Sequence, residues 1–243
     1  MAIKIVVVCE AQADFVVASE IADRLVCDRI KWIEPETLDS FRTFCGLENP
    51  TVFTTWANIA RLARNGNLRV RGHFDGQPAA PDAHAARRAI KIVLRELPDT
   101  DTILLIRDDD RQTARRQGLE QARSESIFSE RIIIGLAHCK RECWVLSGFV
   151  ALDDREVRLL NELRSELGFD PCSTAGNLTA SHFQDLRSAK RVLSVLTGGI
   201  WEREVRCWRD TSLAVMRERG VETGLADFIA ELESRLLPLL GGR

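Results

Sequence analysis

Three short, almost uninterrupted apolar runs constrain the fold of this chain more than any other feature. They are rich in β-branched residues and cover residues 3–9, 102–106 and 131–136. Continuous runs of this length are typical of strands buried on both faces, as in parallel sheets. Each run is followed by a stretch with helical character, at residues 17–26, 111–124 and 139–149. Strands that alternate with helices predict an α/β fold with a parallel sheet and right-handed crossovers.

The segment between the first two runs is irregular, with turn signals at Glu34-Pro35, Asn49-Pro50 and Asn65-Gly66. It predicts a short helix over residues 56–64 and a strand near residues 68–71. A further helix is expected between Pro81 and Pro98, with Asp82 as its cap.

The strand signal disappears after Asp153. Helices are predicted at residues 155–167, 182–196, 201–219 and 224–240, separated by glycines and a proline. We therefore expect an α/β domain over residues 1–150 and a helical C-terminal extension over residues 151–243, packed on or beside it. One compact unit is the alternative.

Composition excludes several classes of protein. The 34 basic and 36 acidic residues give a net charge of −2, so overall charge argues for no polyanionic partner and leaves open only a local basic surface. No apolar run is long enough for a membrane span or a secretory signal. Seven cysteines without a Cys-x-x-Cys pair indicate neither a disulfide framework nor a zinc ribbon, and we expect a reduced, cytoplasmic protein. Tyrosine is absent, which excludes a tyrosyl nucleophile.

Acidic residues gather where the predicted strands end. They are Glu10 after the first run, Asp108 and Asp110 after the second, and Glu142 past the third. Ligands of open parallel sheets bind at this edge, and carboxylates brought together there need a cation. An oxygen-only set favours Mg²⁺. In an extended tail Asp108 and Asp110 share one side and Asp109 faces away. Helix capping is the alternative, for Asp110 before a helix from Arg111 and for Asp14 in the first helix.

These residues resemble a known family. A strand ending in Glu10 with Asp14 four residues later, and a later strand ending in Asp108-x-Asp110, resemble the Toprim domain, a Rossmann-like fold. Toprim domains occur in topoisomerases, bacterial primases and overcoming-lysogenization-defect (OLD-type) nucleases. Residues 141–146 and, more weakly, 189–193 resemble segments of small stand-alone Toprim-like proteins. The glycine often found after the glutamate is Ala11 here.

The resemblance implies metal-dependent phosphodiester hydrolysis with one or two Mg²⁺ or Mn²⁺ ions. Glu10 would be a general acid/base or a metal ligand, and Asp108 and Asp110 would be the main ligands. Asp14 and Glu142 would serve a second ion, and Lys190 would stabilise the charged phosphorane. A solvated surface role is the alternative for Lys190.

Several members of the family are excluded. The absent tyrosine removes topoisomerase chemistry, and a primase would bring a zinc module and a longer chain. No P-loop motif occurs, although OLD-type nucleases carry an ATPase domain. We therefore expect a nuclease, or the nuclease subunit of a complex with a separate ATPase, in antiviral or plasmid defence or in DNA repair.

Basic residues predict where nucleic acid would bind. Residues 61–96 hold eight basic and three acidic side chains, and Arg111 and Arg115 would share a helical face after Asp110. Ordinary solvated faces are the alternative for most of them, while Arg111 and Arg115 are the predicted phosphate contacts.

Other classes remain as rivals. A Toprim-shaped subunit could bind nucleic acid or a nucleotide without cutting. A nucleotide-sugar transferase would use Asp-x-Asp with Mn²⁺ but has no need of Glu10 and Asp14. A phosphoaspartyl hydrolase would have Thr or Val after its Asp-x-Asp, at the position that Gln112 occupies here.

Two local features complete the predictions. Cys139 and Cys143, beside His138, are assigned to packing rather than to zinc. The apolar stripe of the last helix is assigned to the core, with docking of a partner or of a second copy of the chain as the alternative.

Overall fold

The computed structural model describes residues 2–66, 68, 70 and 72–241, and divides the chain into two compact units. The first, here called the sheet unit, comprises residues 1–107, 112–135 and 230–243. The second, the helical unit, comprises residues 108–111 and 136–229. The domain boundary near residue 150 stays a prediction.

The sheet is parallel around β1 (Ile3–Cys9), which confirms the predicted α/β class. Strand β1 pairs with β2 (Arg42–Cys45), with the short β3 (Thr54–Thr55) and with β6 (Thr102–Asp108), and the order is β2-β1-β6-β7. Strand β7 covers Ile132–Ala137. Since Val8 lies opposite Leu105, β1 and β6 run to the same edge of the sheet.

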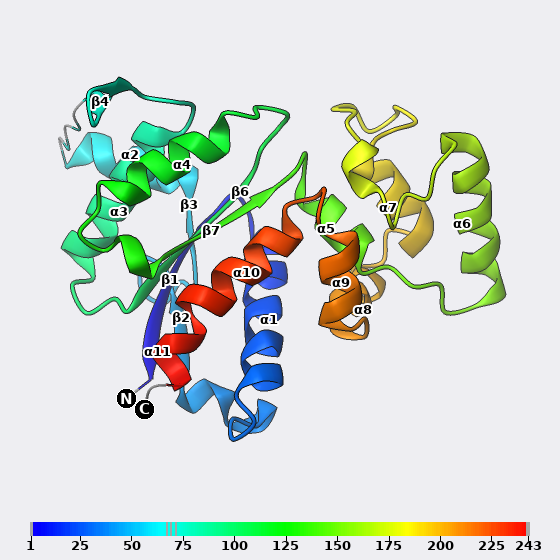
Figure 1. The fold of residues 1–243 in the computed structure, drawn as a ribbon, viewed down its shortest axis with the longest axis horizontal. Helices are drawn as coiled ribbons and strands as arrows, with labels where there is room; N and C mark the ends of the chain where they lie inside the picture. The colour runs from blue at the N-terminus through cyan, green and yellow to red at the C-terminus, as the bar shows by residue number, and fades with distance from the viewer. Residues whose placement is uncertain (1, 67, 69, 71, 242–243) are drawn as a thin grey trace. The chain divides into compact units, whose positions relative to one another are not determined.

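Helices pack around this sheet. Helix α3 (Ala83–Glu96) packs against α2 (Trp56–Asn65) and α4 (Arg115–Ser124), while α1 (Gln12–Arg29) contacts β1. Figure 1 draws α2, α3 and α4 as one group, with α1 on the other side of the strands. Gly118 permits the close approach of α4 to the start of α3, because a Cβ there would lie 1.8 Å from the Pro81 carbonyl oxygen.

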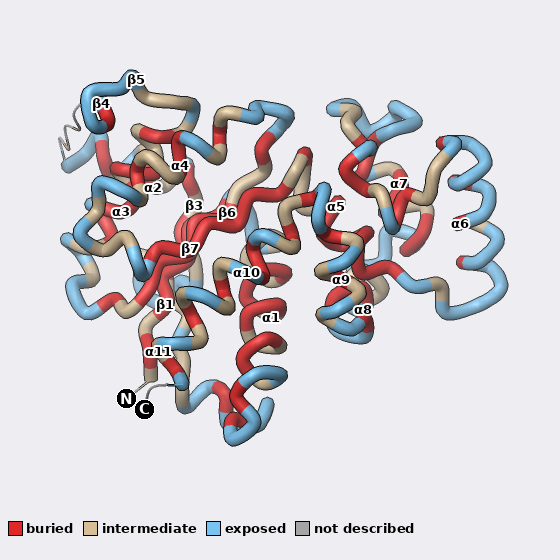
Figure 2. The backbone as a smooth tube through the Cα atoms, in the orientation of Figure 1, coloured by how far each residue is buried: buried red, intermediate tan, exposed pale blue. Residues whose placement is uncertain are grey.

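Strands β1, β6 and β7 form the core of the sheet unit and are drawn mostly as buried in Figure 2. The apolar side chains of β1, β6 and β7 have almost no exposed surface, as the β-branched runs predict. Each fully buried aliphatic side chain contributes about 1.5–3 kcal/mol. The smaller elements are the 3₁₀ helices Pro35–Ser40 and Ser129–Arg131 and the hairpin of β4 (His73–Phe74) and β5 (Gln77–Pro78).

The end of the chain belongs to the sheet unit. Helix α10 (Leu225–Arg235) is followed by the short α11 (Leu237–Gly241). Glu233 pairs with Arg29 of α1, and Glu231 pairs with Arg123 of α4. The apolar stripe is buried within the chain at Leu225, Phe228, Ile229, Leu232, Leu236 and Leu240, which supports its assignment to the core.

The helical unit is built from α5 to α9 and the first turn of α10. The helices are α5 (Arg141–Ser147), α6 (Asp154–Leu167), α7 (Ala189–Thr197), α8 (Trp201–Arg209) and α9 (Leu213–Arg219), with a 3₁₀ turn at Ala175–Asn177.

Two predicted helices of this unit differ from the observed ones. The helix expected from residue 182 begins only at Ala189, because the Ser188 side chain caps it by accepting from the Arg191 N–H. The single helix expected over 201–219 is two helices, since Ser212 caps the second in the same way.

A turn at residues 223–224 fixes the segment that follows β7. The His138 N–H and the Trp144 indole N–H both donate to the Thr223 carbonyl oxygen, at 2.9 and 2.7 Å. The Trp144 ring stacks on Phe228 with centroids 5.0 Å apart. Gly224 has a φ of 76°, and a Cβ there would lie 2.2 Å from the Leu136 carbonyl oxygen, so only glycine fits.

The remaining predictions have these outcomes. The strand near residues 68–71 lies partly outside the described residues, which exclude 69 and 71. Helix α4 starts at Arg115 with Ala114 as its N-cap, so the predictions of a start at Arg111 and a cap at Asp110 are wrong. Over the described parts of the chain, every helix is too short or too polar to cross a membrane. All seven cysteines are free.

Candidate functional site

Residues 108–111, here called the aspartate loop, run directly beside the segment that follows β7. The Asp109 N–H donates to the Ala137 carbonyl oxygen at 2.8 Å, and the Asp110 N–H donates to that of Cys139 at 3.2 Å. The Asp108 carboxylate accepts from the Arg141 N–H at 2.8 Å. Backbone and side-chain bonds therefore hold the loop in one place within the helical unit.

The three aspartates have different surroundings. Asp109 is only 5% exposed, and its carboxylate accepts from the Arg111 N–H at 2.8 Å and contacts His138 Nδ1 at 2.5 Å. Asp108 is half-buried and Asp110 is exposed. The inward side chain of Asp109 thus anchors the loop, while the two outer aspartates lie nearer to solvent.

The backbone of the loop is strained. Asp110 and Arg111 have φ values of 46° and 63°, so two consecutive residues with side chains adopt the left-handed region. Each such residue costs about 1–3 kcal/mol and persists only where the surroundings hold it. The prediction that the tail is extended through Asp110 is wrong, because Asp109 captures the Arg111 N–H and turns the chain.

Asp82 ties together the two flanks of the aspartate loop, which belong to the sheet unit. Its carboxylate lies 2.7 Å from Arg107 Nε and 2.5 Å from Arg115 Nε. Arg107 precedes the loop, and Arg115 begins the helix after it. The Arg107 guanidinium also lies 5.0 Å from the Trp56 ring. Asp82 is the N-cap residue of α3, as predicted, but its side chain makes no cap bond to the helix.

Glu10 and Asp14 occupy the turn after β1 in the same unit. The Glu10 side chain is 42% exposed, and its carboxylate lies 3.8 Å from Arg107 Nη1. Asp14 accepts from the Ala11 N–H at 2.8 Å, across the start of α1. This bond satisfies a donor that the helix leaves open, as the capping alternative for Asp14 requires.

Glu142 lies in the first turn of α5 within a cluster of charged side chains. It accepts from Arg141 Nη2 at 3.1 Å, and Arg141 Nη1 lies 3.8 Å from the Glu204 carboxylate. Burial raises the pKa of Glu204, with the Arg141 charge opposing and the Glu142 charge adding to the increase. Glu142 is 8% exposed, so its carboxylate is engaged inside the helical unit.

The predicted basic residues of the site differ in exposure. Arg111 is exposed and donates to the Ser181 hydroxyl oxygen at 2.8 Å. The Arg115 side chain is 7% exposed and pairs with Asp82. Arg111 lies outside α4, so the prediction that the two arginines share one helical face is wrong. Lys190 is exposed in the first turn of α7.

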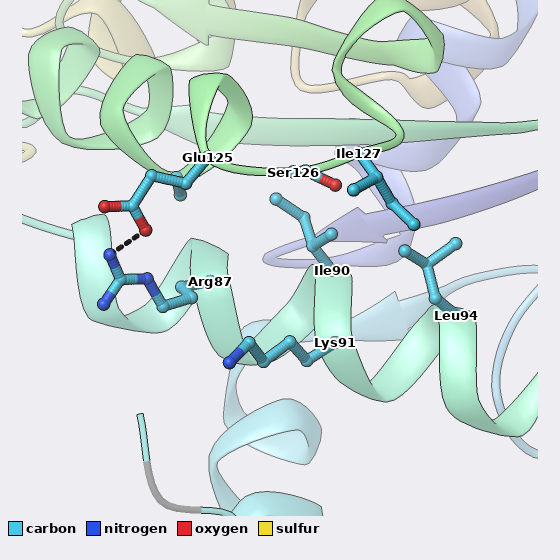
Figure 3. Close-up of a pocket in the computed structure, with 8 residues that line it drawn as sticks. Arg87, Ile90, Lys91, Leu94, Glu125, Ser126 and Ile127 are labelled. Atoms are coloured by element: carbon cyan, nitrogen blue, oxygen red, sulfur yellow. Dashed lines mark hydrogen bonds and ion pairs between the residues drawn. The ribbon is translucent and has the colours of Figure 1, made fainter. Parts of the chain in front are cut away.

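The chain's own acids neutralise part of the basic stretch over residues 61–96. Arg87 is buried and pairs with Glu125 (Figure 3). It also donates to the His73 carbonyl oxygen. Arg61 pairs with Glu48, and Arg95 pairs with Glu96. Figure 3 also shows Lys91 beside the apolar side chains of a cavity between α3 and the residues that end and follow α4. Arg69 and Arg71 lie outside the described residues.

Asp109, His138 and Cys139 form a second cluster beside the loop. One donor atom from each lies within 4.8 Å of the others. Burial raises the pKa of the Cys139 thiol, and the negative charges of Asp109 and Asp108 raise it further, whereas Arg111 lowers it. Cys139 was predicted from the sequence to be a packing residue, and no local pattern joins it to Asp109, which lies 29 residues from His138.

Comparisons with protein-family models, curated proteins and solved structures find no match to this chain. The resemblance to Toprim domains therefore remains a prediction from the motifs.

Proposed function

We propose that this protein is a metal-dependent phosphodiesterase that cuts nucleic acid, with Asp108 and Asp110 as the main ligands of Mg²⁺ or Mn²⁺. The observation that carries the proposal is the strained aspartate loop. Its backbone adopts two costly left-handed residues, and its buried Asp109 is bonded inward between the two outer aspartates. Strain of this kind gathers at functional sites, where the surroundings maintain it.

The donor set fits a hard divalent cation. Asp108 and Asp110 offer carboxylate oxygens, which Mg²⁺ prefers, and a site with few protein ligands suits an ion that keeps water and substrate phosphates. When bound, such an ion supplies charge stabilisation at the phosphate and lowers the pKa of a bound water.

The other predicted residues take supporting roles in the proposal. Glu10 is the candidate general base or additional ligand, since it is exposed and follows β1. Arg111 is exposed next to Asp110 and presents a guanidinium for a substrate phosphate. Lys190 keeps its proposed role in charge stabilisation, and Asp14 and Glu142 keep theirs at a second ion. Arg115 is already paired with Asp82, which favours a positioning role over contact with nucleic acid.

A binding subunit without catalysis is the second candidate. It is favoured by carboxylates that already have partners: Asp14 accepts from Ala11, Asp108 from Arg141, and Glu142 from Arg141. In either case we propose a cytoplasmic protein, since seven free cysteines suit a reducing compartment. A separate ATPase subunit and self-association are further proposals, in a setting of defence or repair.

Cutting assays on the purified chain test the proposal. Plasmid DNA and single-stranded DNA and RNA are incubated with Mg²⁺ or Mn²⁺, with and without EDTA. We expect metal-dependent cutting that Asp110→Asn reduces by about 100-fold or more. Asp75→Asn is the matched control, since Asp75 is an exposed aspartate with a φ of 47° elsewhere in the chain.

The outcomes separate the two candidates. Cutting that survives Asp110→Asn would contradict the proposed site. Binding of nucleic acid without cutting, under every metal condition, would favour the binding subunit.

A further inference from the structure

The Asp109–His138–Cys139 cluster has the arrangement of a transition-metal site. Asp109 Oδ2 lies 2.5 Å from His138 Nδ1, and His138 Nε2 lies 3.8 Å from Cys139 Sγ. All three residues belong to the helical unit. The cluster uses none of the side chains assigned to the proposed phosphodiesterase.

The carboxylate of Asp109 fixes the state of the imidazole ring. Because the Asp109 carboxylate can only accept, the neutral ring donates to it from Nδ1–H. Its other nitrogen, Nε2, then carries a lone pair. A carboxylate that orients a histidine in this way is the usual support of a metal-binding imidazole. The lone pair therefore belongs to the nitrogen that lies near the thiol.

Distances distinguish two ways of placing an ion. Zinc lies about 2.0–2.1 Å from a histidine nitrogen and about 2.3 Å from a thiolate, so a tetrahedral ion separates the two ligands by about 3.6 Å. The observed 3.8 Å between Nε2 and Sγ agrees with that value. The 2.5 Å between Asp109 and Nδ1 is too short for an ion between them, so Asp109 is the orienting group.

Exposure distinguishes a metal site from a reactive cysteine. Cys139 is 3% exposed, whereas a nucleophilic thiol must reach its substrate. The His138 side chain is 36% exposed, which gives an ion a path to the ring. Coordination would deprotonate the thiol and release its proton to solvent, although burial disfavours the free thiolate.

We propose that His138 Nε2 and Cys139 Sγ bind a zinc-class divalent ion, with Asp109 as the residue that orients His138. The remaining coordination positions would be open to water. Imidazole and thiolate select Zn²⁺ or Co²⁺ over Mg²⁺, so this site and the proposed Mg²⁺ site differ in the ion they take.

Cobalt spectroscopy on the full chain is the test, because Co²⁺ reports its ligands. The wild-type protein, titrated with Co²⁺, is expected to develop a thiolate-to-cobalt charge-transfer absorption and the intense visible bands of tetrahedral cobalt. Added Zn²⁺ should displace the Co²⁺ and abolish this absorption, whereas added Mg²⁺ should not.

Four variants assign the signal. Cys139→Ser and His138→Gln should each abolish the charge-transfer absorption, and Asp109→Asn should weaken Co²⁺ binding about 10–100-fold because it reverses the tautomer. Cys27→Ser is the thiol control and should leave the signal unchanged. Asp110→Asn should also leave it unchanged, which separates this site from the proposed phosphodiesterase. Circular dichroism verifies that each variant folds. If Cys139→Ser does not fold, the test rests on His138→Gln.

Two results would overturn the proposal. One is the absence of a charge-transfer absorption at a large excess of Co²⁺. The other is a signal that persists in folded Cys139→Ser or His138→Gln protein. Neither result bears on metal-dependent cutting, which depends on Asp108 and Asp110.

Discussion

The turns after β1 and β6 both carry acidic side chains, yet their backbones differ. After β1, Ala11 is extended and leads at once into α1, with Asp14 bonded across the helix start. After β6, Asp110 and Arg111 are left-handed, and Asp109 is buried with both oxygens engaged. The turn after β1 therefore has an unstrained backbone, while the turn after β6 has a strained one.

This difference separates two uses of a carboxylate. Asp14 has an ordinary structural reason to be acidic, because it satisfies a helix donor. Asp108 likewise accepts from a helix donor, the N–H of Arg141 at the start of α5. What distinguishes the loop is the left-handed backbone at Asp110 and Arg111, and Asp109 and Asp82 hold the loop and its flanks through separate sets of bonds. The comparison therefore favours the aspartate loop over the β1 turn as the metal-binding region.

The largest expected change in stability comes from removing the charge that ties the flanks of the loop. Asp82→Asn leaves Arg107 and Arg115, both mostly buried, without their shared carboxylate. We expect the free energy of unfolding to fall by about 3 kcal/mol, measured by chemical denaturation. Asp39→Asn, whose side chain is 88% exposed beside Arg42, should cost less than about 1 kcal/mol. Equal losses would show that Asp82 is no more than a surface partner.

A second prediction concerns the turn that supports the segment after β7. Gly224→Ala adds a methyl group 2.2 Å from a backbone oxygen at a positive φ, and should destabilise the protein by about 2–3 kcal/mol. Gly168→Ala is the matched control, since Gly168 has a φ of 80° and open space around it. Its cost should be about 1 kcal/mol, the left-handed penalty alone. Thermal or chemical denaturation of both variants would reveal the contribution of crowding, and similar values would contradict it.

The smallest effect is expected at the β1 turn. Asp14→Ala removes the carboxylate that accepts from Ala11 and should cost about 1 kcal/mol of stability. Glu10→Gln, at a side chain 42% exposed, should leave stability nearly unchanged while reducing metal-dependent cutting. A loss of stability in Glu10→Gln as large as that in Asp14→Ala would show that the two acids serve the same structural role.

The fold was predictable because its signal is local. The β-branched runs predict β1, β6 and β7 closely, since burial on both faces requires such sequences. Helix boundaries were less accurate where a serine cap intervened, as at Ser188 and Ser212.

The site was predictable only in part. Asp108 and Asp110 follow from their position at a strand end, but Asp82 lies 25 residues from Arg107, and Asp109 lies 29 residues from His138. Contacts of that kind depend on packing, which no short motif encodes. The left-handed backbone at Asp110 accompanies a local bond, from the Arg111 N–H to Asp109, but the inward position of Asp109 depends on its distant contact with His138.

Binding of Mn²⁺ tests most directly whether the aspartate loop is the metal centre, because it requires no knowledge of the substrate. Electron paramagnetic resonance measures free Mn²⁺ during titration of the wild-type chain and of Asp108→Asn, Asp109→Asn and Asp110→Asn. We predict binding that weakens at least about 10-fold in the Asp108 and Asp110 variants. It should change little in the Asp109 variant, whose inward side chain can still accept from Arg111. Absence of Mn²⁺ binding, or equal loss in all three variants, would contradict the account.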